Sequence, residues 1–154
     1  MVWEILVPTD GSEASDNALA YAAEVAKLYK AELLVLNVVR TDIVTTYRQM
    51  DRESAKEQLM KEREEEAKRI IGQSVNRAER QGVKAEGIIK YGLPDEEITT
   101  LVNERDDIVL IVMGAYGKNF MERQLVGSKT EGVLRKLPHI EVPLVVVPCP
   151  ARKK

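Results

Sequence analysis

The sequence is poor in the residues that build disulfides and metal centres. Its 154 residues include one cysteine, Cys149, and one histidine, His139, so the chain cannot form an internal disulfide and has no cysteine and histidine cluster with metal-ligand spacing. Cys149 stands between two prolines and His139 follows Pro138, and neither has the neighbours of a nucleophile or a general base. Such sparse cysteine usage is typical of a reducing compartment, and we expect a cytoplasmic protein.

A strong net charge and long apolar runs are also missing. Lysine and arginine number 23 against 25 aspartate and glutamate, a formal net charge of -2, so the chain lacks the positive excess that favours nucleic acid. The basic cluster at residues 152–154 is interpreted as a solvated terminus. No apolar run approaches the roughly 20 residues of a membrane span, and the first residues lack the layout of a signal peptide. We expect neither a nucleic-acid partner nor a membrane partner.

Short aliphatic runs, in contrast, recur along the chain. Five of them, rich in valine, isoleucine and leucine, predict strands at residues 3–7, 32–39, 83–90, 108–113 and 142–147. All but the third have consecutive apolar residues, which is typical of strands covered on both faces. The third alternates and is predicted to be peripheral, and the last contains Pro143, which suits a sheet edge.

Helical patterns fill the intervals between these runs. Ser12 is the predicted N-cap of the first helix, and a long charged helix is expected over residues 51–80. Pro94 and the acidic residues after it mark the start of a third helix that runs to about residue 104. A fourth helix is expected from Ser128 to just before Pro138. Residues 40–50 form a long irregular connection and are a candidate lid.

Strict alternation of strands and helices predicts an α/β domain with a doubly wound, five-stranded parallel sheet and four helices on its two faces. Residues 1–154 are expected to form a single domain, because the length suits one core. If the chain returns after the third strand to place the fourth beside the first, the strand order is 3-2-1-4-5. Ligands then bind beyond the carboxyl ends of the first and fourth strands, where the winding reverses.

Glycines follow the fourth predicted strand in a pattern that suits phosphate. Two glycines stand at the strand end, and a third precedes Ser128 at a helix start. Glycine permits close backbone approach, and a helix N-terminus offers unpaired amides to an anion. Each glycine alone is typical of a turn or a cap, but their combination with nearby cations favours phosphate, although the pattern is not a Walker A loop. The candidate residues are Met113, Gly114, Ala115, Tyr116, Gly117, Lys118, Gly127, Ser128, Lys129 and Thr130.

The first predicted strand ends in Pro8-Thr9-Asp10-Gly11-Ser12, which faces the same switch point. Asp10 can hydrogen-bond the sugar or base of a nucleotide, or help to hold Mg²⁺ through water. The alternative is that Asp10 or Ser12 only caps the first helix, and for Ser12 this is the favoured interpretation.

Taken together, these residues resemble the ATP-binding branch of the universal stress protein family. The resemblance spans the whole chain and rests on residues 5–12, 91–94, 111–114 and 143–147 and on the glycine spacing. It implies a Rossmann-like domain of the adenine nucleotide alpha hydrolase kind that binds ATP, with Mg²⁺ or Mn²⁺ as companion. It further implies a homodimer through the last strand, Val142 to Val147. The residues implied around adenine and ribose are Pro8, Thr9, Asp10 and Val38.

Two positions depart from the pattern of that family. Lys129 stands where a small or β-branched residue is usual, and a cation there would strengthen phosphate binding. Tyr116 stands where a short or basic residue is common, and its ring would crowd the ribose.

The predicted function is that of a nucleotide-dependent stress or regulatory protein with slow ATP hydrolysis at most. No catalytic residue is assigned. Asp10 could assist attack by a metal-bound water, but on its own it would give slow hydrolysis at best. One alternative is a nucleotide-processing enzyme, either an ATPase or an adenylyl-transferring relative. Adenylyl transfer would need a pyrophosphate loop rich in glycine and serine after the first strand, and the turn there has too few of these residues. Another is an interaction module in which the glycine loop is structural. The sequence names no regulatory partner.

Overall fold

The computed structural model describes residues 2–41, 53–115 and 128–149 of the chain. Five strands form one parallel sheet of order β3-β2-β1-β4-β5. This confirms the predicted α/β class, strand order and four helices. The elements in chain order are β1 (Glu4–Pro8), α1 (Glu13–Tyr29), β2 (Glu32–Arg40), α3 (Glu53–Arg80), β3 (Ala85–Gly92), α4 (Pro94–Glu104), β4 (Ile108–Gly114), α5 (Ser128–Arg135), the 3-10 helix η2 (Leu137–His139) and β5 (Leu144–Val147).

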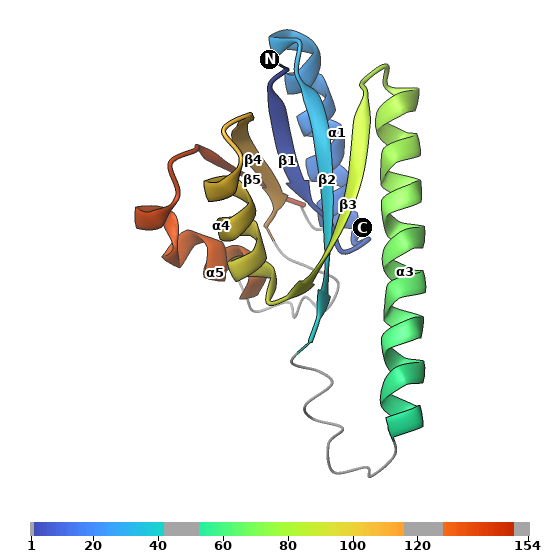
Figure 1. Ribbon diagram of the computed structural model, residues 1–154. Coiled ribbons are helices and arrows are strands. Elements are labelled where there is room, and N and C mark those ends of the chain that lie inside the picture. Colours follow the sequence, from blue (N-terminus) through green and yellow to red (C-terminus); the bar gives the residue numbers. More distant parts are fainter. Residues whose placement is uncertain (1, 42–52, 116–127, 150–154) are drawn as a thin grey trace, which may run out of the picture.

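Two apolar cores lie on the two faces of the sheet. Successive side chains of a strand point to opposite faces, so Ile5 and Val7 of β1 pack with α1 while Leu6, between them, packs with α4. Helices α1 and α3 cover the first face, and α4 and α5 cover the second (Figure 1). The consecutive apolar residues of the central strands are explained by this double burial.

The first helix begins and ends at recognisable signals. The Ser12 hydroxyl accepts a hydrogen bond from the Ser15 amide at 3.2 Å, which confirms Ser12 as the N-cap of α1. The helix ends at Lys30, whose φ of 55° is left-handed. A tight reversal follows, and β2 therefore starts close to the amino end of β1, pairing Glu4 with Glu32.

The third strand lies two residues later than predicted. It covers residues 85–92 because its register follows β2, from Leu33 opposite Ala85 to Arg40 opposite Gly92. Val83 is buried, but its amide donates to the Ala78 carbonyl at the end of α3 instead of entering the sheet. The sheet order makes β3 an edge strand, as its alternating pattern predicted.

The last strand is shorter than predicted, since it begins at Leu144 and Pro143 precedes it. The Pro143 carbonyl still accepts a hydrogen bond from the Ile111 amide of β4 at 2.9 Å. The proline nitrogen has no hydrogen to donate, so the ladder starts after it. Strand β5 is the second edge of the sheet, as predicted.

The long helix α3 covers 28 residues and is strongly charged along its exposed side. Its buried contacts come from its second half, where Ala67, Ile70 and Ala78 are buried. No helix in the described part of the chain is both long and apolar enough to cross a membrane. Of the predicted irregular connection at residues 40–50, Arg40 is the last residue of β2, and residues 42–50 lie outside the described residues.

Candidate functional site

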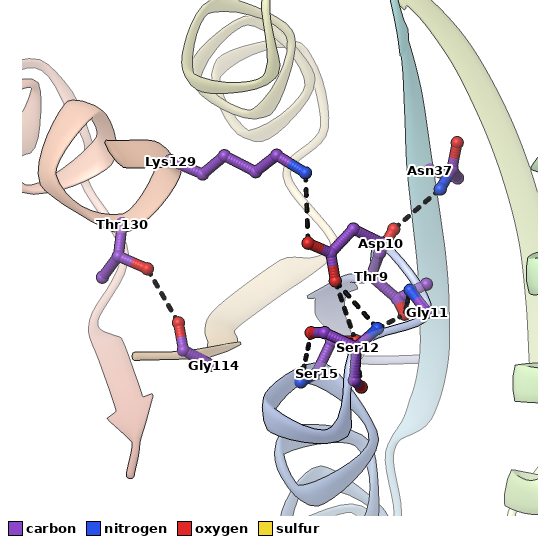
Figure 2. A network of polar contacts seen from close by, with 9 residues as sticks. All are labelled: Thr9, Asp10, Gly11, Ser12, Ser15, Asn37, Gly114, Lys129 and Thr130. Atoms are coloured by element: carbon purple, nitrogen blue, oxygen red, sulfur yellow. Dashed lines mark hydrogen bonds and ion pairs between the residues drawn. The ribbon is translucent and has the colours of Figure 1, made fainter. Parts of the chain in front are cut away.

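The switch point of the sheet lies between β1 and β4, as predicted. These strands are neighbours, yet the chain leaves β1 for α1 on one face and reaches α5 on the other face after β4. The carboxyl ends of both strands lie at the same edge, because the strands are parallel. Figure 2 shows the polar groups that gather there, namely side chains from the β1–α1 turn, the start of α1, β2 and α5 and the backbone carbonyl at the end of β4.

The β1–α1 turn is held by a compact network of short polar side chains. Asp10 Oδ1 accepts from the Ser12 amide at 3.0 Å and lies 3.3 Å from the Ser15 hydroxyl. The buried Thr9 hydroxyl donates to Ser15 Oγ at 3.0 Å and accepts from the Gly11 amide at 3.2 Å. Gly11 has a φ of 80°, which favours glycine. The turn therefore presents Asp10 in a fixed orientation (Figure 2).

Asn37 of β2 is a site residue that the sequence analysis missed. Its side chain is buried, and its Nδ2 donates to the Thr9 carbonyl at 2.8 Å. The Thr9 amide in turn donates to the Leu36 carbonyl at 2.8 Å. Both backbone groups of Thr9 are thus anchored to β2, which extends the strand geometry into the turn. The signal was present in the sequence, since Asn37 is the lone polar residue inside the apolar run from Leu33 to Val39.

Lys129 joins the two sides of the switch point. It lies in the first turn of α5, and its Nζ is 3.3 Å from Oδ2 of Asp10, 119 positions earlier in the chain. The two side chains are partly buried, with 34% of Lys129 and 15% of Asp10 exposed. A cation in the first turn of a helix is disfavoured by the helix dipole. The Asp10 carboxylate offsets this, and the ion pair ties α5 to the β1–α1 turn.

The predicted residues at the end of β4 have structural partners. The buried Thr130 hydroxyl donates to the Gly114 carbonyl at 2.7 Å, which attaches α5 to the end of β4. A Cβ on Gly114 would lie 2.8 Å from the Ala14 carbonyl carbon, so this glycine allows α1 to approach the sheet. Met113 is buried on the α4 side, and the Ala115 amide donates to the Val147 carbonyl at 3.0 Å.

Of the other predicted site residues, three lie in described strands and helices and four lie outside the described residues. Pro8 is the last residue of β1, opposite Leu36, while Val38 lies two residues before the end of β2 and packs partly buried on the α4 side. The structure therefore brings Thr9, Asp10, Gly114, Lys129 and Thr130 together and leaves Val38 inside its strand. Ser128 is the first residue of α5. The remaining four, Tyr116, Gly117, Lys118 and Gly127, lie outside the described residues.

Both oxygens of Asp10 already have polar partners, so a divalent ion that coordinated this carboxylate directly would compete with them, and contact through water stays a prediction. Mg²⁺ takes oxygen ligands at about 2.0–2.1 Å in a near-octahedral arrangement, but Asp10 Oδ1 accepts from an amide and Oδ2 faces the Lys129 ammonium. Across residues 2–41, 53–115 and 128–149, no group of three or more histidine, cysteine, aspartate or glutamate side chains could hold a metal.

Neither candidate nucleophile belongs to this network. His139 is exposed at the end of η2, and Cys149 Sγ lies 3.4 Å from Asn17 Nδ2 on α1. Among the residues that the structure describes, the polar groups of this network are hydroxyls, amides, the Asp10 carboxylate and the Lys129 ammonium. Such groups can bind an anion and a sugar.

Comparison with known proteins identifies relatives along almost the whole chain. The profile of the universal stress protein family matches residues 1–148. Universal stress protein MJ0531 of Methanocaldococcus jannaschii is 32% identical over 150 residues, which cover 97% of this chain and 84% of the relative. The solved structure of protein MJ0577 of the same organism is 30% identical, with a TM-score of 0.81 and 99% of both chains covered. UspA of Lactobacillus plantarum is 27% identical, with a TM-score of 0.80, and covers 94% of this chain and 97% of its own.

Two further solved structures share the fold at lower sequence identity. A universal stress protein in complex with cAMP has a TM-score of 0.64 at 21% identity, covering 95% of this chain and 96% of its own. One from Archaeoglobus fulgidus in complex with dAMP has a TM-score of 0.67 at 19% identity, covering 96% and 98%. The likeness at these identities concerns the fold alone.

Proposed function

The chain belongs to the universal stress protein family, and on that premise we propose that it binds ATP at the switch point as a nucleotide-dependent regulatory protein. The observation that carries the proposal is the short distance between two side chains at the switch point. Nζ of Lys129, in the first turn of α5, lies 3.3 Å from Oδ2 of Asp10, in the β1–α1 turn. A carboxylate accepts hydrogen bonds from ribose hydroxyls, whereas an ammonium beside a helix N-terminus attracts phosphates. The ribose and the phosphates of a nucleotide thus each have a complementary group, and these two groups lie close together.

Hydrogen bonds to neighbouring elements hold the segments that carry these two side chains, which favours a preformed binding site. Asn37 fixes the Thr9 carbonyl, and Thr130 fixes α5 on the end of β4. Within the part of the chain that the structure describes, every buried side-chain nitrogen and oxygen has a hydrogen-bond partner. A preorganised site loses less conformational entropy on binding. Adenine nucleotides in two proteins of this fold indicate that such a sheet accommodates them.

The proposed role is binding with slow hydrolysis at most, in a cytoplasmic homodimer that pairs through β5. Hydrolysis of ATP needs an oriented water and stabilisation of the charge that develops on the phosphates. Lys129 offers charge, but Asp10, the one carboxylate of the network, is already held by Ser12 and Lys129. Any divalent ion would arrive with the phosphates of the nucleotide.

Calorimetry and mass spectrometry test ATP binding directly. We expect titration of ATP into the nucleotide-stripped protein, with MgCl₂ present, to release binding heat with a saturable isotherm. Mass spectrometry of a heat-denatured extract of the freshly purified protein should detect ATP, ADP or AMP. The absence of binding heat with and without MgCl₂, together with an extract free of nucleotide, would overturn the proposal.

A variant of Asn37 tests where ATP binds. Asn37→Leu removes the donor to the Thr9 carbonyl, and we expect the Kd for ATP to rise about tenfold because the turn that carries Asp10 is loosened. Asn103→Leu is the matched control, since Asn103 donates to the His139 carbonyl on the exposed surface at the end of α4. Thermal melts establish that both variants fold. Equal Kd values for the two variants would exclude the β1–α1 turn from the site.

A further inference from the structure

The ion pair between Lys129 and Asp10 leads to an inference that rests on the proposed function. We propose that Lys129 takes the place of the divalent ion, so that ATP binds to this chain without Mg²⁺. Its ammonium pairs with the Asp10 carboxylate in the unliganded chain and, with ATP bound, turns to the phosphates and offsets part of their charge. Lys129 is thus the residue that sets the metal requirement of the site.

The position of the ammonium is the first argument. Nζ of Lys129 is 3.3 Å from Asp10 Oδ2, on the side of the carboxylate that points away from the turn (Figure 2). The other oxygen, Oδ1, accepts from the Ser12 amide at 3.0 Å. An ion that bound directly to Asp10 would have to displace the ammonium or break the turn. Lys129 therefore occupies the coordination direction that a metal would need.

The local charge is the second argument. Lys129 adds a full positive charge to the partial positive charge of the α5 N-terminus. The pair is partly buried, with Asp10 only 15% exposed, so solvent screens this charge less than it screens a surface lysine. Within the described ranges, the Asp10 carboxylate is the partner recorded for this ammonium. A triphosphate carries several negative charges, so it competes successfully with Asp10 for the ammonium.

The chemistry of lysine is the third argument. Its ammonium is a compact charge on a flexible four-carbon stem with three donors. It can turn from Asp10 to a phosphate oxygen without movement of α5, which is held on β4 by the Thr130 hydroxyl at 2.7 Å from the Gly114 carbonyl. Asp10, still fixed by the Ser12 amide, then accepts from a ribose hydroxyl. In this exchange the ammonium keeps a charged partner, and the Asp10 carboxylate keeps hydrogen-bond donors in place of its cation.

The test measures the Kd for ATP by calorimetry in MgCl₂ and in EDTA. For the unaltered chain we expect the two Kd values to agree within about threefold. Lys129→Met has a side chain of similar length without charge, and we expect its Kd in EDTA to rise about tenfold or more, because a charge-assisted contact is lost. MgCl₂ should recover most of that loss in the variant.

Two further variants serve as controls. Lys129→Arg keeps the charge, so its Kd values in MgCl₂ and in EDTA should agree with each other within about threefold, whatever their absolute value. Arg135→Gln removes an exposed cation from the same helix, paired with Glu131 at 2.6 Å, and should change neither Kd. Lys129→Gln is tested in the same two buffers, with the same expectation as Lys129→Met, in case thermal melts show that the methionine variant fails to fold.

The outcomes separate this inference from the proposed function. Binding by the unaltered chain that weakens tenfold or more in EDTA overturns the role of Lys129 but leaves ATP binding standing. The same conclusion follows if the charge-free variants show the small Mg²⁺ dependence of the unaltered chain. A failure of the unaltered chain to bind ATP in either buffer overturns the proposed function, and this inference with it.

Discussion

Gly114 lies at the carboxyl end of β4, where the first turn of α1 packs directly on the strand. A Cβ at this position would approach the carbonyl carbon and oxygen of Ala14 to 2.8 and 2.9 Å. These are backbone atoms, so relief requires a shift of α1 against the sheet. The role of this glycine in packing is independent of any ligand.

We therefore expect Gly114→Ala to lower the free energy of unfolding by about 1–3 kcal/mol, as overpacking does elsewhere. Urea denaturation followed by circular dichroism measures the change. Gly72→Ala is the matched control, because Gly72 lies within α3 and, among the described residues outside its own helical backbone, no atom comes within 4 Å of an added Cβ. That variant should be neutral or gain up to about 1 kcal/mol. An unchanged stability of Gly114→Ala would contradict the close approach of α1.

Residue roles at the switch point were only partly predictable from the sequence. The cap at Ser12 was predicted correctly because capping is local. Asp10 and Lys129 were each assigned to a ligand, and their pairing with each other depends on the return of α5 beside β1, which no local pattern reveals. The packing role of Gly114 depends in the same way on Ala14, a distant residue in the sequence.

At the scale of elements, the sequence predicted which strands and helices exist, and in which order, better than it predicted where they begin and end. Consecutive apolar residues in the central runs required cover on both faces, and the alternating run over residues 83–90 indicated an edge strand. Both ends of β3 and the start of β5 were wrong by two residues, because pairing with the neighbouring strand sets them. β3 follows the register of β2, and β5 starts only after Pro143.

A charged cluster joins the amino ends of β1 and β4, at the opposite edge from the switch point. Arg105 lies 2.6 Å from Glu4 of β1 and 3.0 Å from Asp107, which precedes β4. Burial raises the pKa of Glu4, whose side chain is 9% exposed, although the nearby Arg105 opposes the shift. The hydrogen bond from Arg105 lowers the pKa of Asp107. Arg105 therefore compensates two carboxylates at once.

We expect Arg105→Met to lower the free energy of unfolding by about 2 kcal/mol at pH 7, because it leaves Glu4 buried without its cation. Asp107 contributes stability above its unfolded pKa of about 4, and this is lost as pH falls through its lowered folded pKa. The variant lacks that contribution, and its Glu4 pKa rises further. Both effects act on ionised carboxylates, so the deficit should shrink between pH 7 and pH 4.

Urea denaturation at the two pH values measures this deficit. Arg135→Gln is the control, because Arg135 and Glu131 form an exposed pair within α5 and such pairs contribute about 0.5 kcal/mol or less. A deficit of Arg105→Met that is equal at pH 7 and pH 4 would contradict the electrostatic explanation and indicate loss of packing by the arginine stem instead.

At the scale of the whole molecule, the two edges of the sheet differ in character. Each edge strand pairs with one neighbour within the described residues. The edge at β3 carries Glu86 and Lys90, and charges of this kind oppose pairing with another chain. The edge at β5 reads Leu-Val-Val-Val, and all four residues are only partly buried. An apolar edge of this kind favours pairing with a second copy, consistent with the proposed homodimer.

The hydrogen bonds of β5 show which of its backbone groups are available to a second copy. The carbonyls of Pro143 and Val147 accept from the amides of Ile111 in β4 and of Ala115, which directly follows β4. Backbone groups of a strand alternate between its two sides, so those of Leu144 and Val146 point to the outer edge. Val146→Pro therefore removes an outward amide and spares the ladder to β4.

We expect the unaltered chain to be a dimer at micromolar concentration and Val146→Pro to be a monomer, because proline cannot donate at the edge and its ring obstructs the approaching strand. Light scattering coupled to gel filtration measures the mass. Val146→Thr keeps the amide and the β-branched shape, so it should remain a dimer. A Val146→Pro protein that stays dimeric while its circular dichroism spectrum is unchanged would place the interface elsewhere. A monomeric unaltered chain would mean that the apolar edge of β5 is tolerated without a partner.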